Sequence, residues 1–217
     1  PEERIVTGSP SSLTDLVTDG LCVILLENDR VCETVTPGIP DEEFLRDKVP
    51  MTKEEEREIS LCKLRLKEDS VIYDIGSGSG SVSVEMARMA VKGAVYAIEK
   101  NPTAVALLAQ NKKKFAVDHM TIVEGFAPEA LEDLPAPTHA FLGGTGGNMK
   151  EILSLLLKKN PAVRVTINAI TLETVGEALE AIKELPFTGE DIVCISSARS
   201  RSVGRYHMMI GQNPVYV

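Results

Sequence analysis

The sequence contains no tryptophan, and aromatic residues make up only 4% of its 217 positions. A buried core must therefore be filled mainly by valine, isoleucine, leucine, alanine and methionine. No apolar run approaches the ~20 residues that a membrane-spanning helix needs, so no such helix is predicted. The first ten residues, PEERIVTGSP, match neither a signal peptide nor a transit peptide. These absences favour a globular protein of the cytoplasm.

Positive charge is also scarce, with 23 basic against 32 acidic residues and a formal net charge of -9. This balance disfavours a general nucleic-acid-binding protein, which normally carries a basic face. The four cysteines form no CxxC pair. We interpret Cys22, Cys62 and Cys194 as buried free thiols in a reducing cytoplasm, because their neighbours are apolar. The three histidines have no cysteine partners at ligand spacing, so no metal site is predicted.

Residues 1–36 read differently from the rest of the chain. The run LCVILL (21–26) predicts a short strand between two turn-forming segments. Since a lone strand cannot bury itself, we expect it to pair with another chain or to end a preceding domain. The chain begins without methionine, which fits a piece of a longer polypeptide. Proline and glycine in TVTPGIP (34–40) indicate a linker.

From residue 41 onward, helical and strand patterns alternate. Thr52 and Glu55 have the spacing of a capping box, and Asn101 followed by Pro102 predicts a helix start. A short helix is expected after Pro128. The predicted helices are 52–66, 81–91, 102–115, 147–159 and 172–184, and the predicted strands are 71–75, 94–98, 120–124, 138–143 and 163–170.

Two last strands, near 190–198 and 205–211, have no room for a helix between them and therefore predict an antiparallel hairpin. The whole pattern predicts an α/β fold with a doubly wound, mainly parallel, seven-stranded sheet and an antiparallel C-terminal edge. Ligands of such sheets bind beyond the carboxyl ends of the strands.

The segment YDIGSGSG (73–80) follows the first strand of this pattern at that edge. Its glycines do not have the spacing of a dinucleotide-binding loop, because Ser81 stands where that pattern requires glycine. The loop also lacks the lysine of a triphosphate-binding loop. A tight glycine turn without a phosphate grip suits a ligand with a sugar and a zwitterionic amino-acid tail, such as S-adenosylmethionine. A turn that binds nothing is the alternative.

Glu99 ends the second strand and can accept hydrogen bonds from both ribose hydroxyls. The same arrangement occurs in NAD sites, so Glu99 indicates a ribose without separating the two ligand classes, and a solvated carboxylate is the alternative. The loop EGFAPEAL (124–131) should border the adenine, where the backbone N–H of Ala127 is available. A plain connection is the other interpretation of this loop.

The residues then match a known family. The chain resembles the decarboxylating subunit of precorrin-6Y methyltransferase, of cobalamin biosynthesis, from about residue 38 to its end. Asp74 to Gly80 alone would indicate only a Rossmann-like class I methyltransferase, but the ordered set is more specific. The matching segments are GIPDEEF (38–44), VPMTKEE (49–55), DIGSGSGSVSVE (74–85), YAIEKNP (96–102), APEAL (127–131), GGTGG (143–147), NAITLET (168–174) and NPVYV (213–217).

The resemblance implies a reaction and a partner. Members of the family methylate C15 of the macrocycle with S-adenosylmethionine and remove carbon dioxide from the acetate at C12. A partner domain, often fused, methylates C5, so residues 1–36 are expected to be the tail of such a tetrapyrrole-methylase domain, and 37–217 the methyltransferase domain. The family tends toward homotetramers. Phe126 departs from the family, which often has aspartate there, so an adenine contact through that side chain is not expected.

The site residues carried over or expected near the ligands fall into two groups, and no catalytic residue is assigned. The cofactor group is Thr52, Asp74, Gly76, Ser77, Gly78, Ser79, Gly80, Glu99 and Ala127. The substrate group is Gly143, Gly144, Thr145, Gly146, Gly147, Asn168, Arg199, Arg201 and Arg205.

The substrate group follows from the chemistry of a large, multiply charged carboxylate. Three arginines within SARSRSVGR (197–205) concentrate positive charge in a chain whose net charge is -9, and arginine pairs well with carboxylates. A solvated hairpin loop is the alternative. The glycines of GGTGG would let a flat ring lie against the backbone. Two other functions stay open: a class I methyltransferase of RNA or protein, and a non-catalytic cofactor-binding module.

Overall fold

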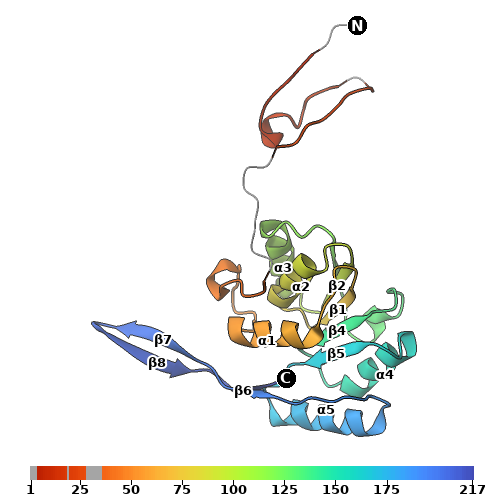
Figure 1. Cartoon of the computed structure of the whole chain (residues 1–217), viewed down its shortest axis with the longest axis vertical. Coiled ribbons are helices and arrows are strands. Elements are labelled where there is room, and N and C mark those ends of the chain that lie inside the picture. Colours follow the sequence, from red (N-terminus) through yellow and green to blue (C-terminus); the bar gives the residue numbers. More distant parts are fainter. Residues whose placement is uncertain (1–3, 19, 28–35) are drawn as a thin grey trace. The chain divides into compact units, whose positions relative to one another are not determined.

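The computed structural model describes residues 4–18, 20–27 and 36–217, and the chain divides into two units at Thr34–Val35 (Figure 1). The described part of the first unit contains one short 3-10 helix, Pro10–Ser12, and no strand. The strand predicted at 21–26 is therefore wrong. Its large apolar side chains are 76–98% exposed, because this part of the unit offers no second strand to pair with. Part of the predicted linker, residues 34 and 35, lies outside the described residues.

The second unit is an α/β fold, as predicted, around a five-stranded parallel sheet of order β3-β2-β1-β4-β5. The strands are β1 (Val71–Ile75), β2 (Ala94–Glu99), β3 (Met120–Glu124), β4 (His139–Leu142) and β5 (Arg164–Ile167). The helices are α1 (Glu54–Leu64), α2 (Ser81–Met89), α3 (Pro102–Lys114), α4 (Met149–Lys159) and α5 (Leu172–Glu184). Short 3-10 helices lie at Asp41–Glu43 and, after Pro128 as expected, at Glu129–Leu131.

Two apolar layers hold the helices to the two faces of the sheet. On one face, α1, α2 and α3 bury residues such as Leu61, Met86 and Leu108. On the other face, α4 and α5 bury residues such as Leu153 and Ala181. The chain changes face between β1 and β4, so the loops after these two central strands diverge and leave a crevice at their carboxyl ends.

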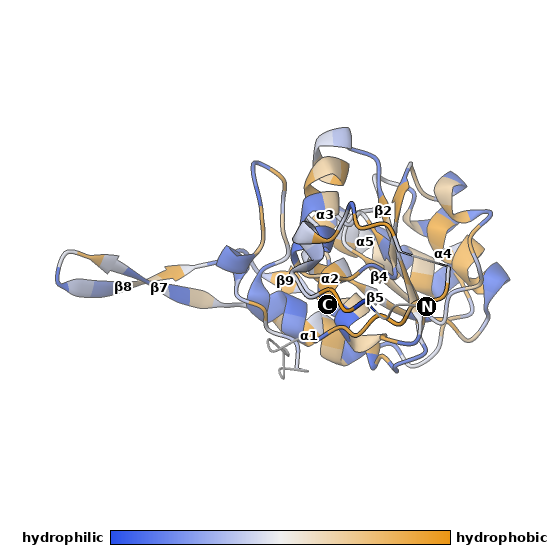
Figure 2. Ribbon diagram, turned by 90° about the horizontal axis from the view of Figure 1, so that it is seen from above, coloured by the Kyte–Doolittle hydropathy of each residue, from blue (hydrophilic) through white to orange (hydrophobic). Residues whose placement is uncertain are grey.

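The sheet has five strands rather than the seven predicted. The short strands β6 (Cys194–Ile195) and β9 (Val215–Tyr216) pair with each other, and only a bridge from Ala169 to Tyr216 links them to the end of β5. β7 (Ala198–Val203) and β8 (Tyr206–Gly211) form an antiparallel hairpin, as predicted, but its first strand lies at 198–203 rather than near 190–198. The hairpin extends away from the sheet (Figure 1). Figure 2 shows apolar and polar residues mixed along both of its strands.

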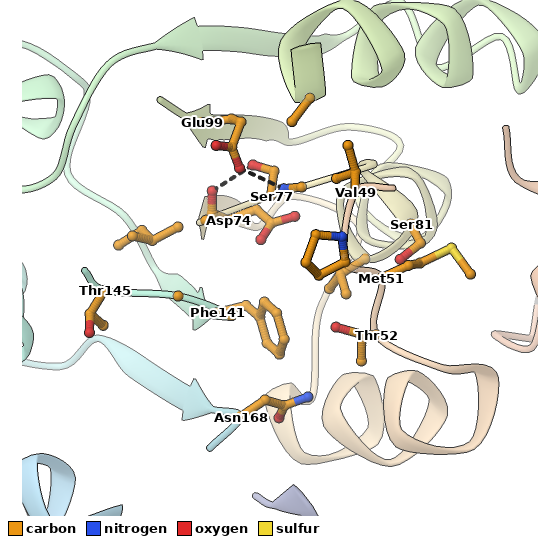
Figure 3. A pocket seen from close by; sticks show the side chains of 18 of the residues that line it. Val49, Met51, Thr52, Asp74, Ser77, Ser81, Glu99, Phe141, Thr145 and Asn168 are labelled. Carbon is orange, nitrogen blue, oxygen red and sulfur yellow. Dashed lines mark hydrogen bonds between the residues drawn. The ribbon is translucent and has the colours of Figure 1, made fainter. Parts of the chain in front are cut away.

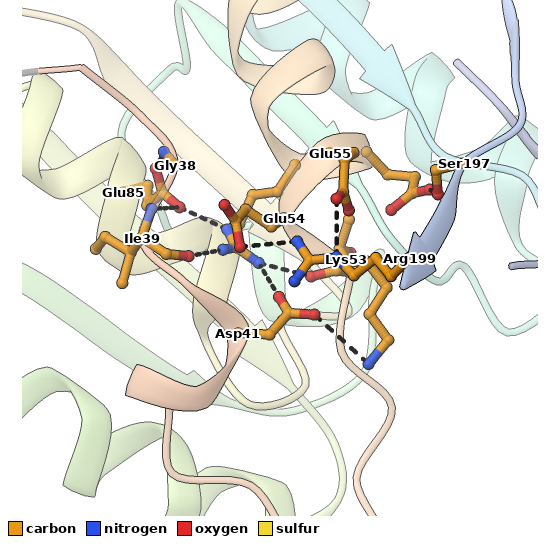
Figure 4. Close-up of polar contacts among 12 residues, drawn as sticks. Gly38, Ile39, Asp41, Lys53, Glu54, Glu55, Glu85, Ser197 and Arg199 are labelled. Atoms are coloured by element: carbon orange, nitrogen blue, oxygen red, sulfur yellow. Dashed lines mark hydrogen bonds and ion pairs between the residues drawn. The ribbon is translucent and has the colours of Figure 1, made fainter. Parts of the chain in front are cut away.

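The segment before α1 is held in place by a buried arginine (Figure 4). Arg57 is fully buried and contacts the carboxylates of Glu85 and Asp41 and the carbonyl oxygens of Ile39 and Thr52. These bonds fix the stretch that continues over the crevice as residues 49–53.

Two local predictions are corrected. The capping box is wrong: the N-cap of α1 is Lys53 and not Thr52, and a lysine side chain has no acceptor for a cap bond. Glu55 accepts a bond from Arg199 instead. The cysteines Cys22, Cys62 and Cys194 are free, but they are exposed rather than buried. The cap at Asn101 is confirmed, because its side chain accepts from the N–H of Thr103.

Candidate active site

A cavity of about 790 Å³ opens at the carboxyl ends of β1, β2, β4 and β5 (Figure 3). Its size lies in the range of small-molecule sites. The walls come from the loop after β1, the end of β2, the loops after β3, β4 and β5, and residues 49–53. The segment 211–213, which follows the hairpin, closes one side. The cavity therefore lies where the strand pattern predicted it.

The loop from β1 to α2 forms the floor of the cavity. Gly76, Gly78 and Gly80 all have positive φ, at 76°, 54° and 82°. A Cβ on Gly76 would lie 2.6 Å from the carbonyl oxygen of Gly144, and one on Gly78 would lie 2.9 Å from that of Pro50. A Cβ on Gly80 would meet Leu108. The glycines are thus required by backbone conformation and by close protein neighbours, a reason that the sequence did not reveal.

Glu99 organises the same loop from the end of β2. Its Oε2 accepts from the N–H of Gly78 and its Oε1 from the N–H of Asn101, both at 2.9 Å. The side chain lines the cavity and is half-buried. Each carboxylate oxygen has a further lone pair for a ligand hydroxyl.

Asp74, at the carboxyl end of β1, is fully buried against the cavity. Burial, and to a lesser degree the nearby negative charge of Glu99, raise its pKa to about 7, although the hydroxyl of Ser83 donates to its Oδ2. The other oxygen, Oδ1, has no hydrogen-bond partner among the residues that the structure describes. An unpaired buried acceptor is costly, so this oxygen is suited to a ligand that donates.

The loops after β3 and β4 meet at the side of the cavity predicted to border an adenine. Ala127 is buried, and its carbonyl oxygen accepts from Asn148. The ring of Phe126 is 38% exposed, with the ammonium of Lys100 4.6 Å from its centroid. Gly146 lies against the same ring.

The opposite side of the cavity is polar. It includes Thr52, Glu56 and Asn168, with Gln212 and Asn213 from beyond the hairpin. Asn168 is buried after β5, and its Oδ1 accepts from the hydroxyl of Ser60 on α1 at 2.9 Å.

Most of the sequence-predicted site residues lie together in the wall of this cavity: Thr52, Asp74, Gly76, Ser77, Gly78, Glu99, Ala127, Gly143, Gly144, Thr145, Gly146 and Asn168. Three others are in the same loops but do not line it: Ser79, Gly80 and Gly147.

The three arginines do not lie in the cavity wall. Arg199 donates to Glu55 and Glu54 of α1, each at 2.8 Å, and these bonds raise its pKa further. Arg205 donates to the hydroxyl of Tyr206, and Arg201 is exposed on the hairpin.

Sequence reasoning missed Glu56, Phe126, Lys100 and residues 211–213 as parts of the wall. Glu56 belongs to the acidic run KEEERE, which has the composition of a solvated helix face. Its inward position depends on contacts that are distant in sequence, among them the bond from Ser197.

The chain is similar to known proteins in sequence and in structure. A family model described as the precorrin methyltransferase domain matches residues 42–217. A curated relative from Sulfurisphaera tokodaii, named probable cobalt-precorrin-6B C(15)-methyltransferase (decarboxylating), is 41% identical. Its alignment covers 83% of this chain and 95% of the relative.

Two solved structures extend the likeness. Precorrin-6y C5,15-methyltransferase from Geobacter metallireducens is 38% identical with a TM-score of 0.77, over 84% of this chain and 96% of that chain. Precorrin 8w decarboxylase from Methanobacterium thermoautotrophicum is 37% identical with a TM-score of 0.77, over 82% of this chain and 96% of that chain.

Proposed function

The chain belongs to the family of precorrin methyltransferase domains, and on that premise we propose a specific reaction for its cavity. The protein methylates C15 of a precorrin of the precorrin-6Y type with S-adenosylmethionine. It also removes carbon dioxide from the C12 acetate, in cobalamin biosynthesis. The observation that carries this proposal is the single cavity in which a glycine loop, a strand-end carboxylate and a polar substrate side face one another.

The chain's residues fit S-adenosylmethionine, which supplies an electrophilic methyl group on a sulfonium sulfur. Asp74 presents an unpaired buried acceptor, Oδ1, to the amino group of such a ligand. Glu99 has acceptor capacity for the ribose hydroxyls, and the loop 76–78 presents bare backbone. Ala127 and Phe126 border the adenine, with the Lys100 ammonium over the ring of Phe126.

The polar side of the cavity then receives the macrocycle. The glycine-rich loop 143–146 gives a flat ring access to backbone, and Thr52 and Asn168 offer polar contacts. Methyl transfer requires mainly that the accepting carbon be held in line with the sulfur. For the decarboxylation, the residues around the acetate remove it from water, and the conjugated macrocycle takes up the electron pair.

Positive charge for the substrate carboxylates is available at the cavity from Lys53 and Lys100. The three hairpin arginines, Arg199, Arg201 and Arg205, are proposed to add to it when a bound ligand or a second copy of the chain approaches the hairpin. Positive charge has to be concentrated at the cavity because the whole chain carries a net charge of -9.

We further propose that the protein works as a homo-oligomer, a tetramer by resemblance. The support is the hairpin, whose apolar side chains Val203, Tyr206, Met208, Met209 and Ile210 are 47–65% exposed. An isolated two-stranded ribbon is marginally stable in water. Residues 1–36 are proposed to be the tail of a preceding tetrapyrrole-methylase domain, supported by the exposed apolar run at 21–26. The exposed free thiols suit a reducing, cytoplasmic setting.

The function is tested in two steps. Calorimetry with S-adenosylhomocysteine should show one binding site per chain. Single-turnover incubation with S-adenosylmethionine and cobalt-precorrin-6B, the compound named in the curated relative, should then give a product that has gained one methyl group and lost carbon dioxide. Binding without turnover would mean that the protein is a non-catalytic cofactor-binding module. Methylation of bulk tRNA at a higher rate than that of the precorrin would mean that RNA is the substrate.

A further inference from the structure

Glu56 is a buried carboxylate in the cavity that the proposed function has not used. It is 2% exposed, lies in the first turn of α1 and lines the polar side. Its Oε1 accepts from the hydroxyl of Ser197, 2.8 Å away. Its Oε2 is buried and has no hydrogen-bond partner within residues 4–18, 20–27 and 36–217. One oxygen is thus fixed by the protein while the other is left for a ligand.

Asn168 complements this carboxylate. It is 8% exposed, and its Nδ2 is also buried without a partner among the described residues. Ser60 lies between the two residues: its hydroxyl oxygen is 2.6 Å from the backbone carbonyl oxygen of Glu56 and 2.9 Å from Asn168 Oδ1, and its single proton bonds to one of these oxygens at a time. The same wall therefore presents an unpaired donor and an unpaired acceptor. Leaving both without partners is costly, which is expected where a ligand supplies the missing partners.

A carboxylic acid group matches this pair. Its carbonyl oxygen accepts from Asn168 Nδ2, and its O–H donates to Glu56 Oε2. Two ionised carboxylates do not match, since the pair would share no proton and would place two negative charges together. The wall therefore suits one carboxyl group of the substrate that shares a single proton with Glu56.

The geometry points to Glu56 as the residue that moves the proton during decarboxylation, an assignment that rests on the proposed function. Glu56 takes the proton from the acetate O–H. The bond between the methylene carbon and the carboxylate carbon breaks, carbon dioxide leaves, and the electron pair enters the conjugated macrocycle. The pair then returns to the methylene carbon and forms a C–H bond with the proton on Glu56. The acetate becomes a methyl group, no oxidant or reductant is needed, and the carboxylate is regenerated.

The test compares Glu56→Gln with the wild-type protein in single turnover with cobalt-precorrin-6B, measuring carbon dioxide release separately from methyl transfer. The glutamine keeps the size of the side chain but cannot carry the proton. Carbon dioxide release should slow by about 10²–10⁴-fold, the range for loss of general acid–base catalysis. Affinity for S-adenosylhomocysteine should stay unchanged. Release at the wild-type rate would overturn the assignment.

Glu55→Gln is the matched control. Glu55 precedes Glu56 on α1 and also has a buried unpaired oxygen, but it bonds to Arg199 and does not line the cavity. This variant should release carbon dioxide at the wild-type rate.

Glu56→Ala separates a proton-carrying role from a structural one. The truncation leaves space for a small acid, so added formate should restore part of the carbon dioxide release. Loss of release in both Glu56 variants without rescue by formate would contradict the assignment. A wild-type protein that leaves the precorrin unchanged would instead overturn the proposed function, and the role of Glu56 with it.

Discussion

Glu99 has two roles at the end of β2, which makes it the most informative single residue of the cofactor side. It fixes the glycine loop through the N–H groups of Gly78 and Asn101. It is also the proposed acceptor for the ribose hydroxyls. Replacing it by alanine should weaken S-adenosylhomocysteine binding by about 2–4 kcal/mol, the value of two hydrogen bonds to a charged group. Calorimetry measures the dissociation constant directly.

Glu124 provides the control for this prediction. It ends β3 directly beside Glu99 in the sheet register, is exposed, and does not line the cavity. Glu124→Ala should leave the dissociation constant unchanged. Equal affinity of the Glu99→Ala and wild-type proteins for S-adenosylhomocysteine would mean that the ribose does not bind to Glu99.

Asp74 should give the stability of the ligand-free protein a distinctive pH dependence. Its pKa is raised from 3.8 to about 7 in the folded state. Between these values the folded state holds a proton that the unfolded state releases. This contribution to stability is complete below the unfolded pKa and is lost as the pH rises through the folded pKa, by roughly 1.4 kcal/mol per pH unit.

The measurement compares urea unfolding of wild-type and Asp74→Asn proteins from pH 4 to 8. The wild-type free energy of unfolding, relative to that of the variant, should fall with rising pH up to about 7 and then level off. A constant difference across this range would mean that Asp74 is ionised throughout.

At the scale of elements, the regular part of the fold could be predicted from sequence. The five strands of the parallel sheet and the five α-helices appear within a few residues of their predicted positions. Their periodicity is local, and each pattern is bounded by glycine, proline or a cap. The family motifs likewise placed Thr52, Asp74, Glu99 and Asn168 around one cavity.

The failures share a physical cause, because each depended on a partner distant in sequence. The strand expected at 21–26 does not form, because the described part of the first unit offers no second strand to pair with. Glu55, the acid of the predicted capping box, accepts a bond from Arg199, a residue 144 positions later. The same pairing turns that arginine toward α1. The inward orientation of Glu56 depends on α1 and Ser197 coming together. Local pattern carries no information about such contacts.

Two facing loops give a prediction about the elements that form the cavity. Gly76 follows β1 and Gly144 follows β4. Gly76 has a positive φ, and a Cβ on it would clash with the backbone of Gly144. A Cβ on Gly144 would meet nothing within 4 Å. Gly76→Ala should therefore force the loops apart and lower both stability and S-adenosylhomocysteine affinity. The φ strain alone costs about 1–2 kcal/mol.

Gly144→Ala is the matched substitution, and it should fold with nearly wild-type stability. Thermal unfolding with and without S-adenosylhomocysteine distinguishes the two variants. If Gly76→Ala retained full stabilisation by the ligand, the close approach of these loops would not be needed for the cofactor site.

For the whole molecule, the net charge and the position of the hairpin arginines bear on one question: how the chain binds a negatively charged substrate. A chain with a net charge of -9 has to bind a substrate with many carboxylates, yet Arg201 and Arg205 lie on the hairpin and outside the wall of the chain's own cavity. Residues opposite each other in an antiparallel pair point to the same face. Arg199 lies opposite Ile210, and Arg201 lies opposite Met208. One face of the hairpin therefore combines exposed apolar side chains with arginines, a composition suited to an interface between copies of the chain.

Introducing charge on that face should dissociate the proposed oligomer. In the double variant Met208→Lys/Ile210→Lys, two ammonium groups would have to be buried at the interface, so sedimentation velocity should show monomers where the wild-type protein forms tetramers. Ser200→Lys/Ser202→Lys places the same charges on the opposite face of the hairpin, because side chains alternate along a strand, and should sediment as the wild type. A wild-type monomer, or a Met208→Lys/Ile210→Lys tetramer, would exclude this face as the interface. The hairpin arginines would then have to reach the substrate within one chain.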